Sequence, residues 1–255
     1  MRPRIRARRG QELVLEPEAE REELRAYLGE AYDENRLRGW RQVLEQELAE
    51  VGDEAKLYRV SQAYLYNLTA FAMSQTKLPY LRRLLRHVPE GGSLLDYGCG
   101  IGSDGLMLLE AGYRVAFADF DNPSTTYLRW RLGRRGLSAP VYDLDREVPA
   151  GFDAAFCFDV VEHVEDPFEL LGGLEARASV VAVNLLEDDE EDSELHRSLP
   201  IRELTDHAAS RGLLSYSRHH GGRSHLLIYS PATAGPLRRV RSRARVWRGR
   251  LAQSG

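Results

Sequence analysis

The sequence predicts an α/β fold in which a mostly parallel sheet of seven strands closes with an antiparallel hairpin and is preceded by a helical cap. Two observations lead to this class. Up to about residue 90 the apolar residues recur at helical spacing, and beyond it short apolar runs alternate with helical segments. Such alternation is typical of a parallel sheet covered by helices on both faces. The last two runs meet at Gly221 and Gly222, which indicates a tight antiparallel connection.

The first 88 residues are predicted to form the helical cap. Helical spacing extends over residues 18–51, with a break expected near Gly39, and again over residues 54–73. A third helix is predicted for "PYLRRLLRHV", because Pro79 would occupy its first turn, where a missing N–H costs nothing.

Residues 89–232 are predicted to form the domain that contains the sheet, and residues 233–255 a basic tail. With 255 residues, 43% of them hydrophobic, the chain is long enough for one sizeable core and an appendage. The strand candidates, in chain order, are "SLLDY", "YRVAFAD", "APVYD", "FDAAFCF", "ASVVAVNLL", "LLSYSRHH" and "SHLLIYS".

Positive charge is concentrated at the two ends of a chain whose formal net charge is -4. Arginines gather at the start (Arg2, Arg4, Arg6, Arg8 and Arg9), and seven more lie between residues 238 and 250. The net charge argues against a general nucleic-acid binder. The tail also carries an apolar stripe at helical spacing (Leu237, Val240, Ala244, Trp247 and Leu251), which suits docking on the acidic body of the protein or lying on an anionic membrane surface.

Cysteine content and hydropathy point to a cytoplasmic protein. Cys99 and Cys157 both fall in or beside predicted buried strands, which is no disulfide framework and fits a reducing compartment. No run of the sequence approaches the roughly 18 apolar residues of a membrane span. The arginine-rich start is not followed by an apolar segment, so we do not expect a secretory signal.

A glycine-rich stretch, "LLDYGCGIGSDG", follows the first predicted strand. Glycines at this place let backbone N–H groups approach a ligand at a helix N-terminus. Gly100, Gly102 and Gly105 fit the G-x-G-x-x-G dinucleotide pattern. Gly98, Gly100 and Gly102 also fit G-x-G-x-G, with Asp96 two residues ahead. A carboxylate there would repel a pyrophosphate and attract an ammonium group, so we expect an amino-acid-like cofactor.

These motifs resemble those of the class I S-adenosylmethionine-dependent methyltransferases over roughly residues 90–230. The resemblance implies a Rossmann-like fold and S-adenosyl-L-methionine as cofactor. It implies that Gly98, Gly100 and Gly102 line the methionine moiety and that Asp96 faces its amino end.

The later motifs arrive in the order of the same family. In "VAFADFD" the resemblance implies that Asp119 takes the ribose hydroxyls and that Phe120 lies against the adenine. In "VYDLDREVPAGFD" it implies an acid that accepts a hydrogen bond from the adenine amino group. We choose Asp143 for this role over its competitor Asp145. Asp159, in the fourth-strand motif, completes the predicted cofactor-binding set.

The stretch "FDVVEHVEDP" is similar to the "EVxEHVxDP" motif of the ubiquinone-biosynthesis O-methyltransferases. Asp159, Glu162 and His163 have the spacing of one helical face, and in some members the resemblance implies a divalent cation at such residues. Asp in place of Glu at 159 shortens the reach, so we expect no metal and take His163 as a candidate general base or a pocket wall. His196, which follows the acidic run "EDDEED" of residues 187–192, is the second candidate base.

The sequence therefore predicts a methyltransferase that acts on an oxygen, nitrogen or carbon nucleophile of a small organic molecule. The fourth strand is not followed by an "NPPY"-like stretch, which argues against adenine-N6 methylation of nucleic acid. Two alternatives stay open: an RNA or protein methyltransferase, suggested by the arginine-rich ends, and a catalytically silent cofactor-binding partner.

Overall fold

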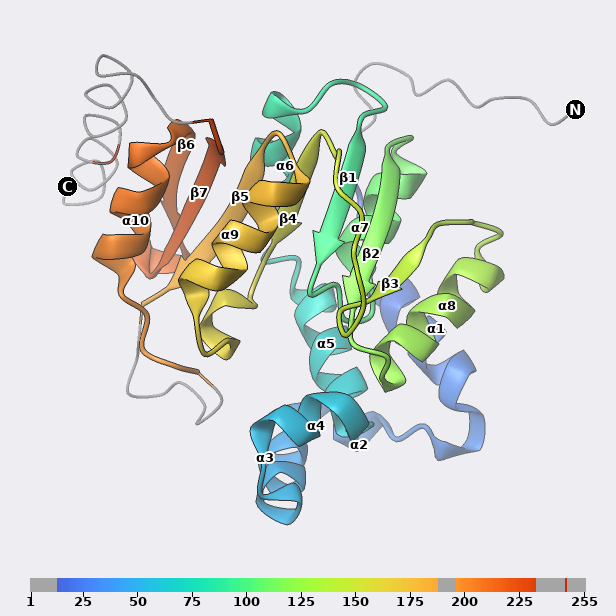
Figure 1. Cartoon of the computed structure of the whole chain (residues 1–255). Helices are drawn as coiled ribbons and strands as arrows, with labels where there is room; N and C mark the ends of the chain where they lie inside the picture. The colour runs from blue at the N-terminus through green and yellow to red at the C-terminus, as the bar shows by residue number, and fades with distance from the viewer. Residues whose placement is uncertain (1–12, 188–195, 233–245, 247–255) are drawn as a thin grey trace, which may run out of the picture. The chain divides into compact units, whose positions relative to one another are not determined.

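A computed structural model describes residues 13–187, residues 196–232 and Val246. Its strands follow the order β3-β2-β1-β4-β5-β7-β6 in a seven-stranded sheet, which confirms the predicted fold class (Figure 1). The arginine-rich start, residues 188–192 of the acidic run and the basic tail other than Val246 lie outside the described residues, so the predictions made for them stay predictions.

The chain divides into two compact units, and the division passes through the glycine-rich stretch. The first unit comprises Met1–Arg82 with Gly98–Val148, and the second comprises Arg83–Tyr97 with Pro149–Gly255. The boundaries predicted from sequence, at residues 88 and 232, stay a prediction.

The first unit contains the helices expected for the cap. They are α1 (Pro17–Leu28), η1 (Gly29–Ala31), α2 (Glu34–Arg38), α3 (Trp40–Val51), α4 (Glu54–Val60) and α5 (Ala63–Ser74), and α6 (Leu78–Leu84) follows them. The expected break at Gly39 is confirmed. Two further breaks were not predicted. The first lies between α1 and α2, where Tyr32 adopts an extended backbone after η1. The other separates α4 from α5, where Ser61 adopts an extended backbone and its hydroxyl accepts the Tyr64 N–H at 2.9 Å.

The same unit holds β2 (Arg114–Asp119), β3 (Val141–Asp143), α7 (Ser103–Glu110) and α8 (Pro123–Arg134). β2 and β3 pair in parallel, with Asp119 opposite Asp143. The cap helices share a core with α8 and with the loop before α7, in which Leu24, Tyr66, Ile101 and Tyr127 are almost fully buried. Burial of these side chains is what holds α1 and α5 against α8 (Figure 1).

The second unit contains the other five strands. They are β1 (Ser93–Tyr97), β4 (Ala154–Cys157), β5 (Val181–Leu186), β6 (Gly212–His219) and β7 (Ser224–Ser230), with α9 (Pro167–Arg177) and α10 (Ile201–Ser210) between them and the short turns η2 (Leu85–His87), η3 (Val161–His163) and η4 (His220–Gly222). β1, β4 and β5 are parallel, and β7 is antiparallel to β5 and β6. The predicted hairpin is confirmed, since Gly221 and Gly222 have positive φ in its turn. All four residues of β4 are buried, as expected for a strand covered on both faces.

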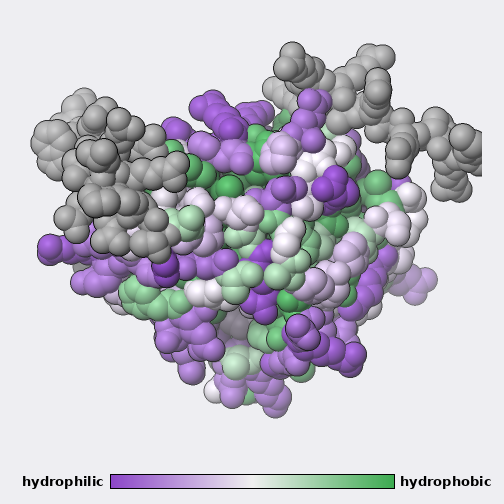
Figure 2. Space-filling view, turned by 45° about the horizontal axis from the view of Figure 1, so that its top comes forward, coloured by the Kyte–Doolittle hydropathy of each residue, from purple (hydrophilic) through white to green (hydrophobic). Residues whose placement is uncertain are grey.

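Hydrophilic and hydrophobic residues are interspersed on the face shown in Figure 2. Among the described residues, the large apolar side chains that stay exposed are Val14, Val60, Phe71 and Phe168. None of the helices in the described ranges is long and apolar enough to cross a membrane.

A buried arginine joins the cap to the loop before α7. The Arg131 side chain is fully buried, and its guanidinium donates to Glu23 Oε2 at 2.8 Å and also to Glu20 Oε1. It further donates to the Ile101 carbonyl and the Ser103 hydroxyl, both at 2.8 Å. Burial opposes ionisation of Glu23, but the hydrogen bonds and charges of Arg135 and Arg131 outweigh it, so the pKa of Glu23 is lowered.

We expect the variant Arg131→Ala to lose about 3–5 kcal/mol of unfolding free energy, because it removes the nearest cation of the buried Glu20 and one of the two arginines that pair with Glu23. Urea-induced unfolding measures this loss. Arg129→Ala, on the same helix but in an exposed pair with Asp121, is the matched control and should cost at most about 1 kcal/mol. A loss of less than about 1 kcal/mol in Arg131→Ala would contradict the charge-compensation account.

Candidate functional site

The glycine loop after β1 has a backbone that other residues could not adopt without strain. Gly98, Gly100 and Gly102 have φ angles of 70°, 52° and 73°. A Cβ at Gly100 would lie 2.8 Å from Leu68 Cδ1, and one at Gly102 would lie 2.4 Å from Leu128 Cδ1. The glycine pattern therefore has a structural reason within the first unit, since helices pack directly against the bare backbone.

Asp119, at the end of β2, is hydrogen-bonded to this loop. Its Oδ2 accepts the Gly100 N–H at 2.7 Å, and its Oδ1 accepts the Phe120 N–H at 2.7 Å. Each carboxylate oxygen keeps a second lone pair, so the pair of oxygens can still accept two hydroxyl groups. Burial raises the pKa of the Asp119 carboxyl to about 6, although the two backbone N–H groups favour its charged form.

Phe120 and Asp145, which lies just after β3, contact an arginine from the cap. The Arg59 guanidinium lies 4.2 Å from the centre of the Phe120 ring. It also forms a bidentate pair with Asp145, at 2.6 and 2.9 Å. Asp143 Oδ1 accepts the Asp145 N–H at 3.1 Å. Asp145 is thus engaged with Arg59, and Asp143 stays our choice for the adenine contact.

A pocket lies beside the glycine loop within the first unit. Leu68 and Phe71 of α5 line it together with Cys99, Ile101 and Met107. The lining mixes these apolar side chains with polar and charged ones, among them Lys77 and Asp104, and pockets that take small molecules combine both kinds.

Asp96 belongs to the second unit, where it is the fourth residue of β1. It lies opposite Phe156 of β4, and only 5% of its surface is exposed. Its proposed role toward the amino end of the cofactor stays a prediction.

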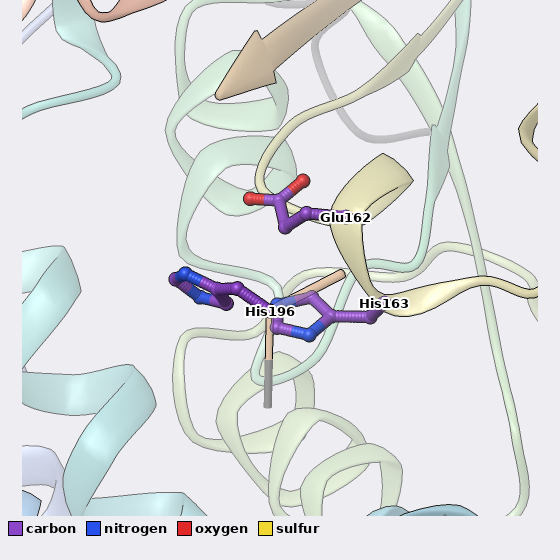
Figure 3. A group of neighbouring side chains, drawn as sticks. All are labelled: Glu162, His163 and His196. Atoms are coloured by element: carbon purple, nitrogen blue, oxygen red, sulfur yellow. The ribbon is translucent and has the colours of Figure 1, made fainter. Parts of the chain in front are cut away.

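The structure brings the two predicted bases together (Figure 3). The rings of His163 and His196 lie edge to face, with centroids 5.0 Å apart. Glu162, which is 2% exposed, joins them, and ligand atoms of the three side chains all lie within 4.8 Å of one another. The Arg197 N–H donates to the Glu162 carbonyl at 2.9 Å, and this bond holds the segment of His196 beside η3. We call these three side chains the Glu-His-His cluster.

Asp159 does not share a helical face with Glu162 and His163, so that expectation is wrong. The helical turn η3 begins only at Val161, and Asp159 has a φ of 54°, in the left-handed region. The Asn184 side chain holds it there: Asn184 Oδ1 accepts the Asp159 N–H at 2.8 Å, and Asn184 Nδ2 donates to Asp159 Oδ1 at 2.6 Å. His196, and not Asp159, is the third side chain beside Glu162 and His163.

Sequence reasoning missed Arg59 and Asn184. Arg59 reads as one charge on a solvated helix, and its contact with Phe120 spans 61 positions of the chain. Asn184 carried a usable signal, since a lone amide inside the apolar run "VVAVNLL" must find a hydrogen-bond partner when it is buried.

Comparison with known proteins finds a methyltransferase domain in part of the chain. Residues 95–180 match a family model described as a methyltransferase domain. A glycine N-methyltransferase of Rattus norvegicus is 37% identical over 78 residues, a match that covers 25% of this chain and 26% of that protein. The chain thus spans about a quarter of the length of this relative.

Solved structures share the fold at low sequence identity. Magnesium protoporphyrin IX methyltransferase from Synechocystis PCC 6803, solved with bound SAH, has a TM-score of 0.53 at 13% identity and covers 74% of this chain and 99% of that one. An S-adenosylmethionine-dependent methyltransferase from Clostridium acetobutylicum has a TM-score of 0.50 at 12% identity, with 64% of this chain and 98% of that one covered.

The sheet has the fold that solved methyltransferase structures share. The part of the chain that matches the methyltransferase-domain model, residues 95–180, holds the glycine loop and Asp119. This match indicates S-adenosyl-L-methionine as the cofactor, and the positive-φ glycines of the loop with the remaining lone pairs of Asp119 fit such a group.

We expect the affinity for S-adenosylhomocysteine, the demethylated cofactor, to fall as the pH is lowered through about 6. Below its raised pKa Asp119 is protonated in the free protein, whereas ribose hydroxyls would donate to the charged form. Binding must then release a proton, so the affinity should drop about tenfold per pH unit below that value. Calorimetric titrations at pH values from about 5 to about 8 measure how steeply the affinity depends on pH.

The variant Asp119→Asn is the control for this pH dependence. It should bind more weakly, by about 1.5–3 kcal/mol for lost charge-assisted hydrogen bonds, and with no change of slope near pH 6. Equal pH dependence in wild type and variant would assign the titration to another group.

Proposed function

We propose that the protein transfers a methyl group from S-adenosyl-L-methionine to an oxygen, nitrogen or carbon nucleophile of a small organic molecule. The observation that carries the proposal is the Glu-His-His cluster, because it sets two imidazoles beside a buried carboxylate on a methyltransferase fold. A silent cofactor-binding partner would have no use for such an arrangement.

On the cofactor side, we keep the roles that the sequence resemblance implies, and the contacts of Asp119 in the first unit support its part. Gly98, Gly100 and Gly102 would line the methionine moiety. Asp119 would accept hydrogen bonds from the ribose hydroxyls. Phe120 would lie against the adenine, and Asp143 would accept a hydrogen bond from the adenine amino group. When bound, the cofactor supplies a sulfonium methyl that is already activated for displacement. The protein then has to align the acceptor and exclude water from it.

On the acceptor side, an imidazole of the cluster would take the proton that the nucleophile loses. His163 and His196 are the candidates, and the buried Glu162 carboxylate would stabilise the imidazolium that forms. The proton moves to an imidazole nitrogen as the acceptor uses its lone pair for the new bond to carbon.

A small acceptor is supported by two observations. The relative with 37% local identity is named for methylation of glycine, a small molecule. The pocket beside the glycine loop mixes apolar side chains with polar ones and holds one lysine and one aspartate, which suits an organic compound more than a polyanion. The arginine-rich ends that suggested an RNA or protein substrate lie outside the described residues.

Incubation of a metabolite extract with isotopically labelled S-adenosyl-L-methionine, followed by mass spectrometry, tests the proposal. We expect a labelled small molecule to form. If the label enters only RNA or protein, the corresponding alternative replaces the proposal, and transfer to no acceptor at all would favour the silent partner.

With the acceptor so identified, we expect His163→Ala or His196→Ala to lower turnover about 10²–10⁴-fold. The affinity for S-adenosylhomocysteine should change little, because neither imidazole is assigned to the cofactor. Steady-state kinetics and calorimetry separate the two effects. If turnover is unchanged in both variants, proton transfer plays no part and alignment alone drives the reaction.

A further inference from the structure

We propose that the Glu-His-His cluster is a binding site for a divalent transition-metal ion. This departs from the sequence-based expectation that no metal is bound. It also differs from the ligand set that the spacing had suggested, since His196 is included and Asp159 is not.

The geometry of the cluster suits an ion. The Glu162 oxygen and the ring nitrogens of His163 and His196 lie within 4.8 Å of one another. Ligands at about 2.0–2.2 Å from a tetrahedral ion are roughly 3.3–3.5 Å apart. The ligand atoms would therefore have to move closer by roughly 1 Å to close around an ion.

The donor atoms select the kind of ion. Two imidazole nitrogens and one carboxylate oxygen suit zinc, cobalt, iron or manganese, whereas magnesium and calcium prefer oxygen ligands throughout. Glu162 is 2% exposed, and a dication would be attracted strongly to a carboxylate at that depth. Metal binding requires the carboxylate form of Glu162 and the neutral form of both imidazoles.

The backbone holds the ligands in place from two distant segments. The Arg197 N–H donates to the Glu162 carbonyl at 2.9 Å, and the His163 N–H donates to the Val160 carbonyl at 3.0 Å. Arg197 directly follows His196, so the first bond keeps that imidazole beside η3 (Figure 3). Ligands that are held before the ion arrives cost less free energy to order when it binds.

Three protein ligands leave at least one coordination position open, as in catalytic rather than structural sites. This consequence rests on the proposed function: an imidazole nitrogen bound to the ion cannot also accept a proton. With an ion in place, its charge would lower the pKa of a hydroxyl or amine acceptor held at the open position, and the acceptor's proton would pass to solvent water instead of to an imidazole.

Titration of untagged, chelator-treated protein with Co²⁺ tests the site, because a Co²⁺ ion with nitrogen and oxygen ligands absorbs visible light. We expect one equivalent to bind to the wild type. His196→Ala and Glu162→Gln should each weaken binding at least about 100-fold, since loss of a direct ligand exceeds the 10–100-fold effect of an outer partner. Glu162→Gln keeps the shape of the side chain, so it tests the site even if His196→Ala does not fold.

The matched control is His220→Asn. His219 and His220 form a second imidazole pair, with ring centroids 6.4 Å apart, and asparagine tolerates the left-handed backbone of residue 220. This variant should bind Co²⁺ as the wild type does. An absorption that disappears in His220→Asn, or that survives in both Glu162→Gln and His196→Ala, would overturn the proposal.

Binding of S-adenosylhomocysteine to the same samples separates this inference from the proposed function. Its binding without a Co²⁺ signal in the wild type would overturn the metal site and leave the methyltransferase proposal standing. A Co²⁺ signal in a wild type that does not bind S-adenosylhomocysteine would support the site and contradict the proposed function.

Discussion

Charge compensation around Arg131 is the constraint on which the first unit depends. A guanidinium with no exposed surface must find partners for its five N–H donors, and here it finds two carboxylates, a hydroxyl and a carbonyl. The two carboxylates belong to α1. The carbonyl and the hydroxyl belong to the residues just before and at the start of α7. Because neither the charge nor its partners can be left buried alone, α1, α8 and the glycine loop are fixed to one another.

This arrangement explains why a helical cap matters to a cofactor loop. The Ile101 carbonyl and the Ser103 hydroxyl flank Gly102, so Arg131 fixes the loop from one side. Asp119 fixes it from the other side through the Gly100 N–H. Leu68 and Leu128 then fill the space that side chains at Gly100 and Gly102 would need. The loop is held by its surroundings before any ligand binds, which reduces the ordering cost of binding.

The sequence predicts local features well and long-range ones poorly. The glycine spacing and the acid at the end of β2 are set by neighbouring residues, so Gly98, Gly100 and Asp119 could be placed on their elements in advance. The break at Gly39 could be predicted for the same reason. By contrast, His196 lies 33 positions beyond His163, and their meeting depends on the Arg197 bond to the Glu162 carbonyl. Nothing in the residues of either segment signals this one backbone bond between two distant parts of the chain.

Asp159 shows how one backbone conformation selects both a residue type and a site. A left-handed residue that is not glycine costs about 1–3 kcal/mol, and Asp and Asn tolerate it better than most. Glutamate lacks the short side chain that can bond locally, so Asp at this position fits its φ of 54°. Asn184 offsets the cost with two hydrogen bonds from the middle of β5. The chain thus leaves β4 through a sharp turn rather than a helix. As a result, the helical turn starts two residues later, and Glu162 and His163 are presented together to His196.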